Sequence, residues 1–116
     1  MIPSGVEIYV ALEPVDMRLS FDRLAGLAHE QTGYDARSGA LFIFFGRRRD
    51  SLKILFFDGS GMAIFYKRLD RHTFKIPEAA SADARYVEGD DAALEALLDG
   101  VDIESPVNAR SRPKTH

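Results

Sequence analysis

The fold is decided by one stretch of sequence, residues 41–69, which reads LFIFFGRRRDSLKILFFDGSGMAIFYKRL. It contains three mainly aromatic and branched apolar runs, Leu41 to Phe45, Leu52 to Phe57 and Met62 to Leu69. Two polar, turn-like segments separate the runs, and the second begins with Asp58-Gly59, a strong hairpin signal. The stretch therefore predicts three antiparallel strands that follow one another as a meander.

The first two runs have apolar residues on both alternating sets of positions, so both faces of the sheet must be covered. A helix over Phe21 to Gln31 would cover one face: Ser20 is a favourable N-cap, and Gly33 is placed to end the helix. Gly26 inside this helix costs about 1 kcal/mol relative to alanine. Close packing of Gly26 against a strand would explain its presence.

The second face needs another cover, from this chain or from a partner chain. A second helix is predicted to begin at Asp90 or Asp91 and to stop at Gly100, with a stripe of leucines between them. This helix is the candidate cover. Further towards the N-terminus, residues 6–12 alternate and predict a half-buried strand that Pro14 ends.

We therefore expect a single α+β domain, residues 1–104, with a mainly antiparallel sheet. The sheet would contain the N-terminal strand and the three-stranded meander, with one helix after the first strand and one near the C-terminus. Residues 105–116 contain two prolines, three basic residues and little that is apolar, and are expected to form a disordered tail.

Composition excludes several classes of protein. The 116 residues have a mass of 12.9 kDa, which fits one domain. The absence of cysteine excludes disulfides, thiolate chemistry and sulfur-ligated zinc. No apolar run approaches the roughly 18 residues of a membrane helix, and the N-terminus lacks a signal-peptide pattern. A soluble cytoplasmic protein is expected.

Charge is unevenly distributed along the chain. Residues 37–75 carry nine basic and three acidic residues, net +6, whereas residues 76–104 carry one basic and nine acidic residues, net −8. This arrangement indicates an anionic partner for the middle segment, or its neutralisation by the acidic segment within the fold.

The meander predicts where the basic residues meet. The turn after Phe45 and the end of the third strand should lie at the same edge of the sheet. This edge would gather Arg47, Arg48, Arg49, Lys67, Arg68 and Arg71, with Lys53 a few residues along. Such a cluster suits the phosphates of a nucleic acid. The alternative is a solvated hairpin tip, charged for solubility and to protect the sheet edge.

Aromatic residues in the meander could stack on exposed bases. Packing of these aromatic residues in the core is the favoured interpretation, and it is least certain for Tyr66. The three histidines, His29, His72 and His116, lack metal-ligand spacing and are expected to be solvated.

Catalysis is not expected. Asp16, Asp58 and Asp70 could be imagined as a metal-binding triad, but the meander places Asp58 and Asp70 at opposite edges. The sequence also lacks a nucleophile elbow, a P-loop and a dinucleotide fingerprint. Neither a metal nor a cofactor is predicted.

Together these segments resemble the accessory protein, often called TnpB, that is encoded by the second open reading frame of bacterial insertion sequences of the IS-sixty-six type. The resemblance runs from about Val6 to Asp102. The matching segments are Asp16 to Arg18, Phe21 to Ala25, Gly39 to Phe44, Gly46 to Asp50, Lys53 to Leu55, Asp58 to Gly61, Lys67 to Leu69 with Phe74 and Pro77, and Leu97-Leu98 with Gly100 to Asp102. Phe57 stands where the family often has tryptophan, and residues 81–91 are more acidic than the family pattern.

The resemblance implies a part in DNA transposition beside a separate, larger transposase, and it supplies no catalytic residues. The leading hypothesis is a non-catalytic accessory protein whose basic edge contacts DNA phosphates or the transposase. The second is a protein-interaction subunit that docks on the transposase without touching DNA, and the third is a metal-dependent nuclease. A homo-oligomer is compatible with each of them.

Overall fold

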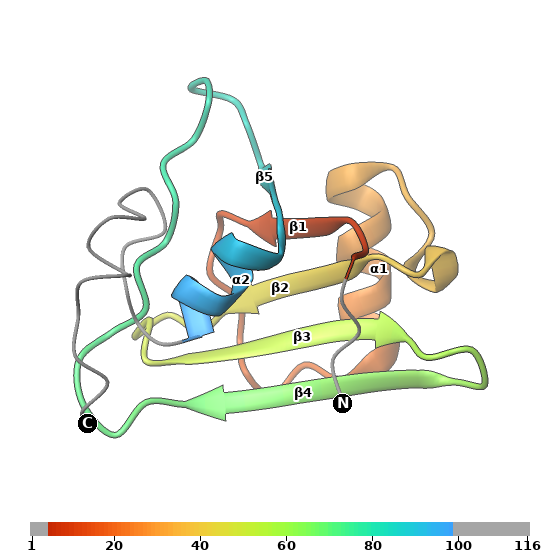
Figure 1. The fold of residues 1–116 in the computed structure, drawn as a ribbon, viewed down its shortest axis with the longest axis horizontal. Coiled ribbons are helices and arrows are strands. Elements are labelled where there is room, and N and C mark those ends of the chain that lie inside the picture. Colours follow the sequence, from red (N-terminus) through yellow and green to blue (C-terminus); the bar gives the residue numbers. More distant parts are fainter. Residues whose placement is uncertain (1–4, 99–116) are drawn as a thin grey trace.

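A mixed five-stranded sheet lies between two helices in the computed structural model, which describes residues 5–98 (Figure 1). The elements are β1 (Ile8–Ala11), α1 (Phe21–Thr32), the short 3-10 helix η1 (Ala36–Ser38), β2 (Leu41–Phe45), β3 (Ser51–Phe57), β4 (Met62–Arg68), β5 (Tyr86–Gly89) and α2 (Asp91–Leu98). The strand order is β4-β3-β2-β1-β5. No helix within the described residues is long and apolar enough to cross a membrane.

The α+β class and the meander are confirmed. Strands β2, β3 and β4 are consecutive antiparallel neighbours, and the register places Phe44 opposite Lys53 and Ser51 opposite Arg68. The turn between β3 and β4 begins with the expected Asp58-Gly59 pair, and Gly59 has a φ of 102°, a conformation that favours glycine.

The expected mainly antiparallel sheet needs a correction. Strand β1 pairs in parallel with β2, because α1 carries the chain across the sheet between them and returns it in the same direction. Strand β5, which was not expected from the sequence, pairs antiparallel with the other side of β1. Strand β1 is therefore an interior strand of a mixed sheet. The expectation that it is half-buried was wrong, because all four of its residues are buried.

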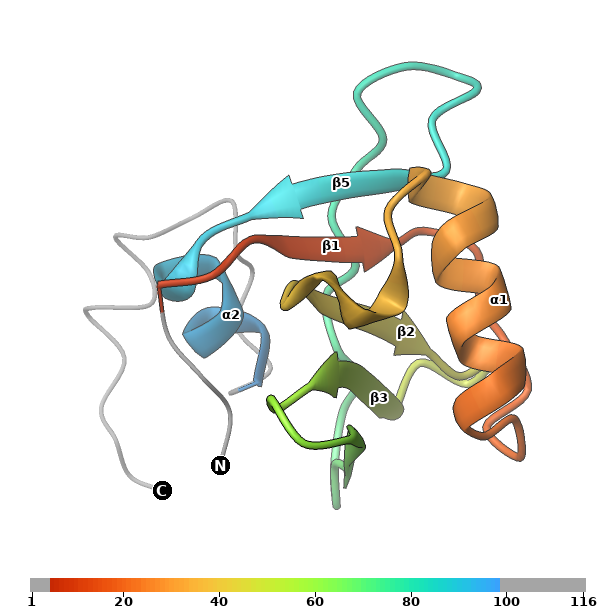
Figure 2. The ribbon, with the colours of Figure 1, turned by 90° about the vertical axis from the view of Figure 1, so that its right-hand side faces the viewer.

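Both faces of the sheet are covered, as the apolar pattern of β2 and β3 required. Figure 2 shows α1 on one side of the sheet and α2 on the other. Leu24 and Ala28 of α1 pack with one set of strand residues, and Leu94 and Leu97 of α2 pack with the alternating set. The buried Phe74, which belongs to no strand or helix, joins the core on the α2 side.

The helix signals were mostly right. Gly33 has a φ of 81°, and its N–H donates to the carbonyl of His29 at 2.8 Å. Ser20 occupies the N-cap position without a side-chain capping bond. In α2 the Asp90 carboxylate accepts from the N–H of Ala93 at 2.9 Å, so Asp90 is the cap. The packing explanation for Gly26 was wrong, because a Cβ there would meet no atom within 4 Å.

Three predictions lie outside the described residues. They are the helix stop at Gly100, the tail over residues 105–116 and the environment of His116.

Candidate functional site: a basic hollow beside the first turn of the meander

The turn between β2 and β3 is tightly built. The N–H of Gly46 donates to the carbonyl of Ser51 at 3.0 Å, and the N–H of Arg49 donates to the carbonyl of Gly46 at 2.9 Å. A Cβ on Gly46 would lie 2.8 Å from Cγ of Met17 and 2.9 Å from Oγ of Ser51. Glycine is therefore needed here for close approach between the turn and the segment that precedes α1.

The same turn is joined to the chain that follows β4. The N–H of Leu69 donates to the carbonyl of Asp50 at 2.8 Å, and the N–H of Phe74 donates to the carbonyl of Arg49 at 2.7 Å. The Phe74 ring lies 6.0 Å from the Phe45 ring in the core. These contacts fix the arginine-bearing turn to the body of the protein, which a freely solvated hairpin tip would not require.

Two unusual backbone conformations occur at this corner of the molecule. Arg49 has a φ of 64° and His72 has a φ of 67°, and they are the non-glycine residues with positive φ among residues 5–98. A left-handed conformation costs a non-glycine residue about 1 kcal/mol or more. Such strain collects at functional sites in many proteins, where the surrounding structure maintains it.

A hollow of about 280 Å³, open to solvent, lies beside this turn. We call it the basic hollow. Its charged and aromatic lining consists of Asp16, Arg47, Arg48, Asp50, Tyr66 and Arg68, and Val15, Met17, Gly46 and Ser51 complete the lining. Three segments distant in sequence thus meet: the link from β1 to α1, the first turn of the meander and the end of β4. Val15 joins the first two, since its N–H donates to the carbonyl of Phe45 at 2.8 Å.

The structure brings together some of the seven basic residues singled out in the sequence. Arg47, Arg48 and Arg68 line the basic hollow. Arg49 and Arg71 are exposed in the two adjoining turns and do not line it. The meander thus brings Arg48 and Arg68 to the lining of one hollow, as the topology required.

Lys67 does not lie with the arginines as expected, because successive side chains of a strand point to opposite faces of the sheet. Arg68 lies on the α1 side of β4, whereas Lys67 lies on the α2 side, where Nζ donates to the carbonyl of Leu98 at 2.8 Å. Lys53 is on the α1 side, and its Nζ donates to the carbonyl of Leu19 at 2.8 Å. Both lysines therefore hold elements of the fold together.

The charged side chains that line the hollow give it excess positive charge. Arg18 donates to the Asp16 carboxylate at 2.7 Å, and this hydrogen bonding, with a smaller contribution from Arg47, holds the pKa of Asp16 well below its usual range. Within residues 5–98, Arg47, Arg48 and Arg68 form no ion pair. Three arginines and two aspartates line the hollow, and Arg18 neutralises one of the aspartates.

Sequence reasoning missed two parts of this site. Asp16 and its partner Arg18 were considered only as a nuclease carboxylate and a family match. Tyr66 was assigned to the core, but it is 52% exposed. The signal for Tyr66 was present, since it lies two positions before Arg68 and therefore on the same strand face. The core interpretation is confirmed for Phe42, Phe44, Phe45 and Phe56, which are all buried.

The other candidate groups do not converge. Asp58 lies in the turn at the far end of the meander, where its carboxylate accepts from the N–H groups of Ser60 and Gly61, which lowers its pKa. His29 and His72 are exposed. In the part of the chain that the structure describes, no three histidine or acidic residues are grouped to hold a metal ion.

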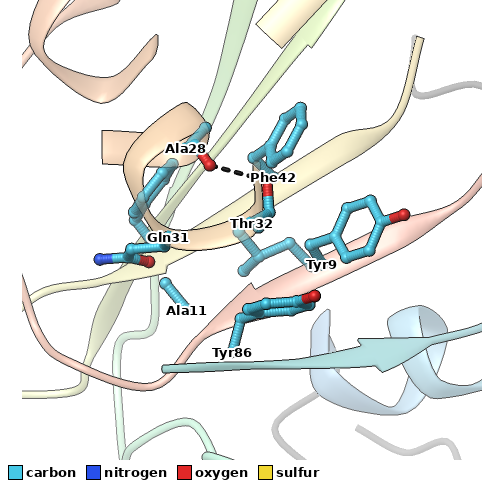
Figure 3. Close-up of a pocket in the computed structure, with 9 residues that line it drawn as sticks. Tyr9, Ala11, Ala28, Gln31, Thr32, Phe42 and Tyr86 are labelled. Carbon is cyan, nitrogen blue, oxygen red and sulfur yellow. Dashed lines mark hydrogen bonds between the residues drawn. The ribbon is translucent and has the colours of Figure 1, made fainter. Parts of the chain in front are cut away.

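A second cavity lies between the end of α1 and strands β1, β2 and β5 (Figure 3). Tyr9, Phe42, Thr32 and Tyr86 contribute to its lining. Its volume is about 10 Å³, room for at most one water molecule. Burial and a hydrogen bond with Tyr34 raise the pKa of Tyr9, whose hydroxyl donates to Glu7 at 3.0 Å. This is packing within the core, too small for a ligand.

Comparison with known proteins assigns the chain to a family. Residues 6–108 match the family model described as "IS66 Orf2 like protein". The chain belongs to this family. Membership connects it with the transposition system of IS66-type insertion sequences, as the resemblance implied, and the family is an accessory family with no known catalytic activity.

Two relatives come from Sinorhizobium fredii (strain NBRC 101917 / NGR234). The chain is 38% identical over 108 residues, 91% of either chain, to the uncharacterized protein y4hO. It is 36% identical over 73 residues, 63% of this chain and 62% of the relative, to the uncharacterized protein y4jC. No solved structure matches the chain.

Proposed function

We propose that this protein is a non-catalytic accessory of transposition that binds the phosphates of DNA through the basic hollow. The observation that supports this most is the meeting of Arg47, Arg48 and Arg68 around one hollow, without ion-pair partners among the described residues. Guanidinium groups suit phosphates because they offer planar, paired donors.

The anchoring of the turn also supports the proposal. The backbone bonds from Leu69 and Phe74 hold the turn that carries Arg47 and Arg48 in one position. A turn whose backbone is already fixed loses less conformational freedom on binding than a mobile one. A tip charged only for solubility would need neither these bonds nor the left-handed Arg49.

The experiment is fluorescence anisotropy with a labelled DNA duplex at two salt concentrations. Arg47→Glu with Arg48→Glu should lower the affinity at low salt by at least about tenfold, and the log–log salt slope should become shallower by about 2. The matched control is Arg37→Glu with Arg85→Glu, which changes the net charge equally at exposed positions outside the hollow. Equal losses in both variants would refute a localised site, and unchanged binding in the first would refute DNA binding here.

The second candidate is docking on the transposase through an acidic surface. It is favoured by four exposed acidic residues in β5, in α2 and at the position between them, namely Glu88, Asp90, Asp91 and Glu95. Deleting this region would remove Leu94 and Leu97 from the core, so charge reversal is the better test. If Glu88→Lys with Glu95→Lys abolishes capture by the cognate transposase while the arginine variant is captured normally, this candidate is supported over the first.

A further inference from the structure

Tyr66 is the most exposed large apolar or aromatic side chain among the described residues. It is 52% exposed, compared with 43% for Phe21 and for Tyr34. It lies on β4 beside the basic hollow, whose lining it shares with three arginines. An aromatic ring that core packing does not bury, next to phosphate-binding side chains, requires its own explanation.

The orientation of the Tyr66 ring is constrained by Lys53, its cross-strand neighbour on β3. Nζ of Lys53 lies 5.3 Å from the centroid of the ring, a cation–π contact. The same Nζ donates to the carbonyl of Leu19, so the cation itself is fixed. The ring is therefore held in place while half of its surface stays open to solvent.

We infer that the basic hollow takes single-stranded DNA, with one unpaired base stacked on Tyr66 and the adjoining phosphates on Arg47, Arg48 and Arg68. This inference rests on the proposed function and specifies its ligand. Proteins that bind single strands combine an aromatic platform with a positively charged path for the backbone. In a duplex the faces of the bases are covered by their neighbours except at the two ends, so the interior of a duplex offers Tyr66 no base to stack on.

The dimensions and charges of the hollow agree with a short segment of strand. Its volume of about 280 Å³ is just below the range for small-ligand sites, and it is open, so a longer strand can enter and leave it. Asp16 and Asp50 also line the hollow and would repel phosphates placed beside them. Arg18 neutralises Asp16. The phosphates of the strand would therefore lie beside Arg47, Arg48 and Arg68.

The test uses the full chain, which contains no tryptophan, so that Tyr66→Trp adds a single fluorophore at the proposed stacking position. A 15-nucleotide single strand of mixed sequence should quench this tryptophan, whereas the same sequence as a duplex, in which only the two end pairs have an uncovered face, should quench it much less. A Phe21→Trp variant, also exposed but outside the hollow, is the matched control and should not be quenched.

Affinity provides the second measurement. Tyr66→Leu should weaken binding of the single strand by at least about fivefold, the lower range for one base stacked on an aromatic ring, and should leave duplex binding unchanged. Phe21→Leu should change neither. Circular dichroism and the unfolding midpoint show whether each variant is folded. An unfolded Tyr66→Leu variant would leave the tryptophan quenching to decide the outcome.

The outcomes separate this inference from the proposed function. If single strand and duplex bind equally, and Tyr66→Leu changes neither affinity, the stacking inference is wrong and phosphate binding by the arginines stands. If neither form of DNA binds at low salt, both are wrong. Quenching of the Tyr66→Trp variant by the duplex to the same extent would also overturn the single-strand preference.

Discussion

The two turns of the meander differ in what holds them. The turn between β3 and β4 is self-contained: the Asp58 carboxylate accepts two backbone N–H groups from its own turn, and Gly59 supplies the left-handed conformation. The turn between β2 and β3 relies on residues elsewhere in the chain. Leu69 and Phe74 donate to its carbonyls, and Met17 lies against Gly46.

This difference shows that the β3–β4 turn can form from its own residues, whereas the β2–β3 turn is held in position by the rest of the protein. Aspartate and glycine are what a local turn needs, and they suffice at the β3–β4 end. At the β2–β3 end an arginine occupies a left-handed position that glycine would fill with less strain. The turn that bears the arginines is thus the one that the rest of the molecule holds in place, and substitutions at both ends test this contrast.

The largest expected effect comes from Phe74, the buried residue beneath the β2–β3 turn. Phe74→Ala should lower the free energy of unfolding by about 3–5 kcal/mol, the range for truncation of a buried phenylalanine. Urea unfolding measures this loss, and Phe21→Ala, on the exposed side of α1, is the control with a much smaller loss. A loss below about 1 kcal/mol for Phe74→Ala would contradict its role as the anchor.

The next effect concerns close approach at Gly46. Gly46→Ala should destabilise the protein by about 1–3 kcal/mol, because the new Cβ must displace Met17 and Ser51. Gly61→Ala in the other turn is the matched control, since a Cβ there meets nothing within 4 Å and φ is not positive. Equal melting temperatures for the two variants would show that the β2–β3 turn can yield and that its contacts do not confine it.

The smallest expected change in stability has opposite signs in the two turns. Arg49→Gly should stabilise the protein by up to about 1 kcal/mol, because glycine adopts a φ of 64° without strain. Gly59→Ala should destabilise it by about 1 kcal/mol, because alanine is strained at a φ of 102°. Thermal unfolding of both variants measures the pair. A destabilising Arg49→Gly would mean that the arginine side chain itself stabilises the turn.

Much of the fold follows from residues that are close in sequence. The apolar residues at both alternating sets of positions in β2 and β3 predicted a sheet covered on both faces, and α1 and α2 provide the covers. The partner of β1 could not be predicted, because the apolar pattern of a strand does not show which strand lies beside it. Strand β5 has only four residues, one of them glycine and one glutamate, and carries too weak a pattern to detect.

The candidate site was predictable only in outline. The topology of the meander predicted that the turn carrying Arg48 would meet the strand end carrying Arg68. Strand alternation, applied strictly, would also have separated Lys67 from Arg68 and joined Tyr66 to it. The contribution of Asp16 and Arg18 depends on the parallel pairing beside β2, which brings Val15 against Gly46, and this pairing has no signal in the sequence.

The interior position of β1 has a consequence for how the chain acquires its structure. Strand β1 leaves the ribosome before the other strands, yet its two neighbours in the sheet are residues 41–45 and 86–89. Pairings between distant segments form late because closing long loops is entropically unfavourable, whereas the hairpins of residues 41–68 need only short loops. The part of the sheet that carries the arginines should therefore assemble first, and the earliest-synthesised strand should be among the last to dock.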